Sequence, residues 1–152
     1  MAILETAIVF ETETILERKY YTSDEVLSPE YRLDLLKAVD GFASAGFNDE
    51  ISSFSLGDFT LIVSSVPVHE PGFEENSGKL MMYSIVQKGM TETVVKENMN
   101  SILEQFLNRY SRSHLFHLNE ERIKKMGEFT ERIDKQFKDL ALKPQDRFKK
   151  IF

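Results

Sequence analysis

Apolar and polar positions along the chain predict five strands and three helices. The stretch from Ile51 to Gly89 is typical of a three-stranded antiparallel meander, with a turn at Gly57-Asp58 and a long polar loop from Pro67 to Gly78. Its last strand is apolar on both faces, with Leu80, Met82 and Val86 on one side and Met81, Tyr83 and Ile85 on the other. Such a strand belongs in the middle of a sheet that is covered on both faces.

Two more strands precede the meander. Ile3 to Phe10 is almost entirely apolar and is therefore expected at the centre of the sheet. Ile15 to Tyr21 carries three charged residues at 17–19, which are typical of an edge strand. The first meander strand, Ile51 to Leu56, is short and rich in serine, and this also indicates an edge.

Helical spacing places one helix between the strands and two after them. The first begins at Ser28-Pro29-Glu30 and ends at Gly46, and the second runs from the cap Thr91 to Tyr110. After a break at 111–113, a third helix begins at the N-cap Asn119 and continues to about residue 142. It either packs beside the second helix or projects, and its large apolar face favours packing: Ile123, Met126, Phe129, Ile133 and Phe137.

This order of elements predicts an α/β (α+β) fold. If the apolar strands are central and the polar ones lie at the edges, meander pairing gives a five-stranded, mixed and mostly antiparallel sheet with the order 2-1-5-4-3. Strands one and five would then run parallel at the centre. We expect the first helix on one face and the two C-terminal helices on the other.

Composition narrows the class of protein. The chain has 152 residues and a formal net charge of −6, which argues against nucleic acid as a partner. It has no cysteine, so disulfides and thiolate chemistry are excluded. No apolar run approaches the ~20 residues of a membrane span, and the N-terminus lacks the basic region of a signal peptide. We therefore expect a cytoplasmic protein, for which peripheral membrane association remains open.

The element order resembles that of the longin domain, which has two N-terminal strands, a long helix, a three-stranded meander and a long C-terminal helix. The resemblance covers residues 1–110 and is carried by residues 7–10, 15–21, 34–43 and 59–63, with residues 111–152 as a helical extension. It implies a non-catalytic adaptor or subunit in membrane trafficking or small-GTPase regulation, binding a small GTPase or another longin-like or roadblock-like subunit. The chain differs from fusion SNAREs because its third helix is too short and too irregular for a full coiled-coil motif.

Candidate chemistry is sparse. His114 and His117 lie three positions apart near two acids, but the segment crosses the expected helix break, so we expect no metal site. His69 adjoins Glu70 in the long loop without a visible orienting partner, and we expect no catalysis there. Without a phosphate-binding glycine loop either, we expect neither a cofactor nor an enzyme. The pairs Lys124-Lys125 and Lys149-Lys150 could contact an acidic partner or lipid headgroups, although a solvated face is the simpler interpretation.

Three functions compete at this point. A longin-like interaction module is favoured over a small-ligand sensor of the PAS or profilin-like kind, because PAS domains usually place several short helices where this chain has one long helix. An enzyme is the third.

For the interaction module, we expect partner binding or homodimerisation at strand three and the exposed side of helix one: Lys37, Asp40, Ser53, Phe54 and Ser55. The alternative is that Phe54 belongs to the core.

Overall fold

The computed structural model describes residues 3–20, 29–44, 53–87, 89 and 91–138. Its strands are β1 (Ile3–Phe10), β2 (Glu13–Lys19), β3 (Ser53–Leu56), β4 (Phe59–Glu70) and β5 (Phe73–Gln87). Its helices are α1 (Pro29–Ser44), α2 (Glu92–Arg109), α3 (Arg112–Phe116), α4 (Glu120–Gly127) and α5 (Thr130–Gln136). The expected helix boundaries at Ser28, Gly46 and about residue 142 lie outside the described residues.

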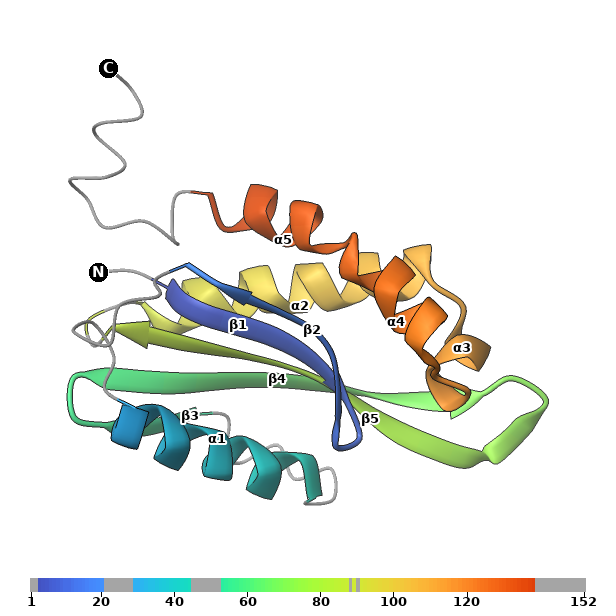
Figure 1. Cartoon of the computed structure of the whole chain (residues 1–152), viewed down its shortest axis with the longest axis horizontal. Coiled ribbons are helices and arrows are strands. Elements are labelled where there is room, and N and C mark those ends of the chain that lie inside the picture. Colours follow the sequence, from blue (N-terminus) through green and yellow to red (C-terminus); the bar gives the residue numbers. More distant parts are fainter. Residues whose placement is uncertain (1–2, 21–28, 45–52, 88, 90, 139–152) are drawn as a thin grey trace.

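The five strands form one sheet in the predicted order, β2-β1-β5-β4-β3. The expected parallel pairing of β1 and β5 is wrong, because all four neighbouring pairs are antiparallel. The long helix explains the difference: α1 carries the chain back along the sheet between β2 and β3 (Figure 1), so β3 runs in the same direction as β2. The meander then returns β5 antiparallel to β1.

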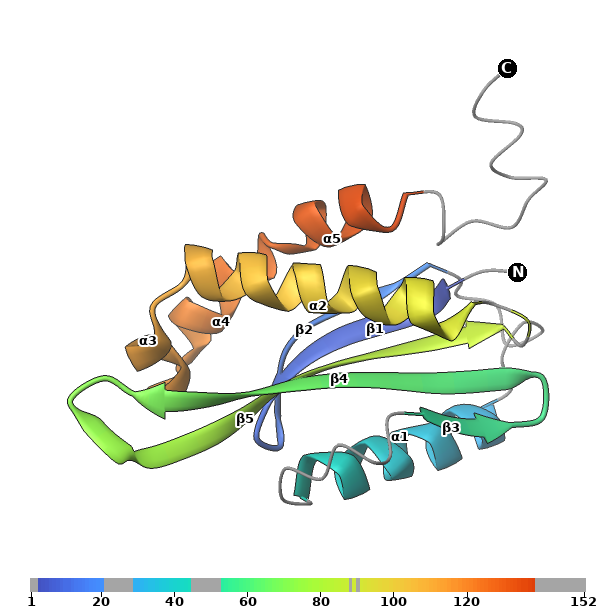
Figure 2. The same ribbon diagram turned by 180° about the vertical axis from the view of Figure 1, so that it is seen from behind.

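Helices cover both faces of the sheet (Figures 1 and 2). One face packs against α1 in a core that includes Leu35, Val39 and three residues of β5, Met81, Tyr83 and Ile85. The other face packs against α2 and the C-terminal helices, in a core that contains the remaining predicted set of β5: Leu80, Met82 and Val86. The two-sided assignment of β5 is therefore confirmed.

The segment 67–78 is not a loop. β4 continues to Glu70 and β5 begins at Phe73, so only Pro71 and Gly72 join them. We call residues 67–78 the hairpin arm, because they form a two-stranded extension beyond the other strands (Figure 1). Gly72 has a φ of 84°, a left-handed conformation that glycine adopts without strain. The prolines and acids suggested a loop, but Val68 is buried against the helical face of the sheet and anchors the arm.

The expected third helix is divided in two. α4 ends at Gly127 and α5 starts at Thr130, with a turn at 128–129 between them, and the short α3 had not been expected. The ring of Phe129 fills the turn and packs edge-to-face on Phe106 of α2, with centroids 5.3 Å apart. The packing prediction is confirmed, since four of its five residues are buried on the sheet and α2: Met126, Phe129, Ile133 and Phe137.

Candidate functional site

The partner-binding residues expected from the sequence lie on β3 and α1. Phe54 is 39% exposed, so the alternative that it belongs to the core is wrong. It is paired with Leu61, which packs under α1, and directly opposed side chains share a sheet face, so Phe54 lies on the α1 side. Ser55 and Lys37 are exposed and Ser53 is half-buried. Asp40 belongs to α1, but its side chain is outside the described part of the structure.

Sequence reasoning missed one apolar residue of this surface. Leu33 on α1 is 55% exposed and precedes Lys37 by four positions, so both lie on the outer side of the helix. Leu33 falls outside the apolar stripe formed by Leu35 and Val39, and this offset was the signal that could have revealed it. We refer to Leu33, Lys37, Phe54 and the backbone edge at Ser55 as the β3–α1 surface; the side chain of Ser55 itself points to the other face of the sheet.

The outer edge of β3 is open within the described chain. β3 pairs with β4 through four residues and ends the sheet on this side. Its two-residue turn, Gly57-Asp58, fixes the alternation of the ladder, because the pair next to such a turn exchanges both backbone hydrogen bonds. On this pattern we expect the amides of Ser53 and Ser55 to point away from β4, where they can meet an added strand.

The opposite edge of the sheet is protected. Arg18 Nε and the Tyr20 hydroxyl, on and just after β2, donate to Asp134 Oδ1 of α5 at 3.1 and 2.8 Å. Burial, followed by the hydrogen bond to Asp134, raises the pKa of Tyr20 far above its usual range. α4 and α5 both contact β2, and exposed charges occupy the strand itself. The β3 edge differs in charge: α1 contacts β3 as the C-terminal helices contact β2, but the described side chains of β3 are uncharged.

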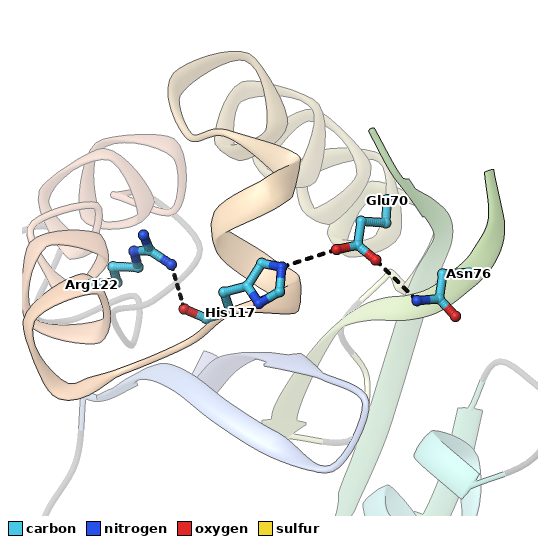
Figure 3. Close-up of polar contacts among 4 residues, drawn as sticks. All are labelled: Glu70, Asn76, His117 and Arg122. Carbon is cyan, nitrogen blue, oxygen red and sulfur yellow. Dashed lines mark hydrogen bonds and ion pairs between the residues drawn. The ribbon is translucent and has the colours of Figure 1, made fainter. Parts of the chain in front are cut away.

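A second polar cluster joins the hairpin arm to the segment between α3 and α4 (Figure 3). Nε2 of His117 lies 2.9 Å from Oε1 of the buried Glu70, and Asn76 Nδ2 donates to Oε2 of the same carboxylate at 2.9 Å. Arg122 Nη1 donates to the carbonyl oxygen of His117 at 2.6 Å. Asn119 caps α4 as expected, accepting from the amide of Arg122 at 2.9 Å.

This cluster replaces the histidine pairings suggested by the sequence. Glu70 contacts His117, while His69 Nδ1 contacts the carbonyl oxygen of Glu74 at 3.2 Å. His114 lies in a different cleft from His117. Within the described residues, no group of three or more histidine, aspartate or glutamate side chains could hold a metal ion. His117 and Asn76 are the hydrogen-bond partners of the buried Glu70 carboxylate. The bond from the Arg122 side chain to the backbone of His117 holds the histidine in place.

A cleft of about 460 Å³ lies beside this cluster. It is bounded by the β1–β2 turn, the arm and the segment after α3, including Glu11, Asn76 and His117. The turn is joined to β5 just after the arm, where the backbone amide of Lys79 donates to Oε1 of Glu11 at 3.0 Å. Glu11, Asn76 and His117 of this cleft therefore all make structural hydrogen bonds.

The chain matches no model of a known protein family, and no curated protein matches it in sequence. Among the described helices, none is long and apolar enough to cross a membrane.

Proposed function

We propose that this protein is a non-catalytic interaction module, similar to longin domains, that acts as an adaptor or subunit in membrane trafficking or small-GTPase regulation. The observation that carries the proposal is the unprotected edge of β3 beside α1, where Leu33 and Phe54 expose apolar side chains. An open strand offers unpaired backbone groups to a partner, and neighbouring apolar side chains provide anchors.

The contrast between the two sheet edges supports this assignment. Exposed charges occupy β2, whereas the described side chains of β3 are uncharged. An exposed edge strand without charges leaves its backbone groups open to pairing with another strand, and β3 offers four residues for this. We therefore assign a protein partner to the β3–α1 surface: a small GTPase, another longin-like or roadblock-like subunit, or a second copy of this chain. A cytoplasmic location fits such partners.

The experiment is a comparison of proline variants. Ser53→Pro and Ser55→Pro remove amides that are expected to point outward, so the ladder with β4 should persist and strand addition should fail. Phe54→Pro serves as the contrast, because its amide is expected to bond β4 and its loss should destabilise the monomer. Oligomeric mass would be measured by light scattering and partner capture by affinity purification with mass spectrometry.

Side-chain variants provide a matched control for the anchors. Phe54→Ser and Leu33→Ser remove exposed apolar groups from the β3–α1 surface, whereas Val94→Ser removes a similarly exposed group from α2. We expect the first two to lose the partner or the dimer and the third to keep it. If folded Ser53→Pro and Ser55→Pro variants both retained oligomeric mass and captured partners, the strand-addition proposal would be wrong.

A further inference from the structure

The helical face carries a cleft whose charge is opposite to that of the whole chain. A cleft of about 590 Å³ opens where the end of α2 meets α3 and α4. Three cationic side chains line it: Arg109 from α2, and Arg122 and Lys125 from α4. Glu121 is the one carboxylate among its lining residues, although the chain has a formal net charge of −6. An anion entering this cleft therefore meets a local excess of positive charge.

Packing holds part of this cationic group in place. The guanidinium of Arg109 lies over the ring of Tyr110, with Cζ 5.3 Å from the centroid. Tyr110 in turn packs on Phe106 with centroids 4.9 Å apart, and its hydroxyl donates to the carbonyl oxygen of Lys125 at 3.3 Å. Arg122 is oriented by its bond to the backbone of His117 (Figure 3). These contacts leave donors of both guanidinium groups able to reach an anion.

The carboxylates near these cations compete only weakly with an anionic ligand. Arg109 Nη2 lies 3.9 Å from Oε2 of Glu128, and Lys125 Nζ lies 3.6 Å from Oε1 of Glu121, with all four side chains exposed. Such solvent-exposed pairs contribute only about 0–1 kcal/mol. Arg122 has no carboxylate within ion-pair distance in the described part of the chain. A dianion can therefore displace the existing pairs.

We propose that this cleft binds a ligand that carries phosphate monoester groups, either a soluble phosphorylated compound or the headgroup of a phosphorylated lipid. Arginine matches phosphate with planar, two-pronged hydrogen bonding, and lysine adds a mobile charge. The cleft volume falls within the range of small-molecule sites. The site involves α2, α3 and α4, on the opposite face of the sheet from α1. It is therefore independent of the proposed partner surface.

The test uses inositol trisphosphate as the soluble probe and unphosphorylated inositol as its control, both titrated by calorimetry. The cleft variant is Arg109→Gln/Arg122→Gln/Lys125→Gln. The control variant Arg112→Gln/Lys124→Gln/Lys135→Gln removes the same charge from exposed positions outside the cleft lining. We expect saturable, salt-sensitive binding of the trisphosphate that falls about tenfold or more in the cleft variant and changes little in the control.

Vesicles distinguish the two sources of the phosphate group. Sedimentation would compare phosphatidylcholine vesicles with and without phosphatidylinositol bisphosphate. Cleft-dependent binding to the phosphorylated vesicles assigns a lipid headgroup, and binding of the free trisphosphate alone assigns a soluble ligand. No saturable binding of either probe by the wild type, or an equal loss in both variants, overturns the proposal.

Folding of the variants is checked by thermal melting. Arg122 contacts the backbone of His117, so its replacement can disturb the segment before α4. If the triple variant melts at a lower temperature, the pair Arg109→Gln/Lys125→Gln is compared with Lys124→Gln/Lys135→Gln, since all four side chains are exposed. The same difference in affinity is expected between these two pairs, and equal affinities would overturn the proposal.

Discussion

Glu70 and His117 are separated by 47 positions in the sequence, and their Oε1 and Nε2 atoms lie 2.9 Å apart. The pair links the hairpin arm to the helical layer. The carboxylate of Glu70 is buried, whereas the imidazole of His117 is largely exposed. The histidine therefore provides a hydrogen-bond partner for a carboxylate that has little access to water. The arm is therefore fastened at its end as well as at its base.

Replacing His117 by alanine is expected to loosen the arm. The change leaves buried Glu70 with Asn76 as its remaining side-chain partner, and a lost partner of a buried polar group costs about 1–3 kcal/mol. We expect urea denaturation to show a decrease of this size in the free energy of unfolding, and hydrogen exchange to accelerate in residues 67–78. His69→Ala is the control, because His69 is exposed on the same arm. Equal effects of both changes would contradict the role of the pair.

Replacing Phe137 by alanine is expected to be severely destabilising. The ring is fully buried in the core beneath the C-terminal helices, and truncation of a buried phenylalanine costs about 3–5 kcal/mol. Chemical denaturation measures the change. Phe73→Ala removes the same group from the arm, where the ring is 58% exposed, and should alter the free energy of unfolding by less than about 0.5 kcal/mol. An unchanged midpoint for Phe137→Ala would mean that α5 does not pack in solution.

A side chain at position 78 is expected to destabilise the protein. A Cβ atom there would lie 2.3 Å from Cζ of Phe10, whose ring packs edge-to-face on Phe116 with centroids 5.1 Å apart. Gly78→Ala must shift this buried ring, and overpacking of this kind costs about 1–3 kcal/mol. Gly127→Ala is the matched control: its Cβ meets open space at the end of α4, and we expect a neutral or slightly stabilising effect. In thermal melting, Gly78→Ala should lower the melting temperature, and Gly127→Ala should leave it unchanged or raise it slightly.

Stability at alkaline pH is expected to depend on Tyr20. Burial and the bond to Asp134 raise the pKa of this phenol in the folded chain, while the unfolded chain ionises near its usual value. The contribution of Tyr20 is therefore fully present below about pH 10 and is lost as the pH rises through the folded-state pKa. Urea denaturation of the wild type should show stability falling above about pH 10, with a shallower fall in Tyr20→Phe. Parallel pH profiles for the two proteins would refute this assignment.

Local patterns predicted the layers of the fold but not its long-range details. The alternation in residues 80–86 placed six side chains on the correct faces of the sheet. A strand that is buried on both faces has apolar residues at successive positions, and this pattern is visible in the sequence. The direction of β1 relative to β5 was missed because it depends on the path of α1 along the sheet, which spacing does not encode. The arm was missed because Pro67 and the acids at 70, 74 and 75 are typical of loops.

The candidate sites show the same division. The edge position of β3 followed from the short serine-rich strand, but the sequence left the exposure of Phe54 open, and Leu33 required knowing which side of α1 faces the sheet. The contact between Glu70 and His117 had no local signal, since it forms only when the arm meets the end of α3. The basic cleft likewise gathers residues from α2 and α4, of which only Lys125 belongs to a charge pair visible in the sequence.

The unequal edges of the sheet limit the size of any assembly built by strand pairing. β2 carries exposed charges and contacts α4 and α5, so we expect strand addition to be less favourable there than at β3. If β3 of one copy pairs with β3 of another, both β3 edges are buried in the dimer. The joined sheet then ends in a β2 strand on each side. On the proposed strand pairing, a closed dimer or a complex with one foreign strand is therefore favoured over a growing polymer.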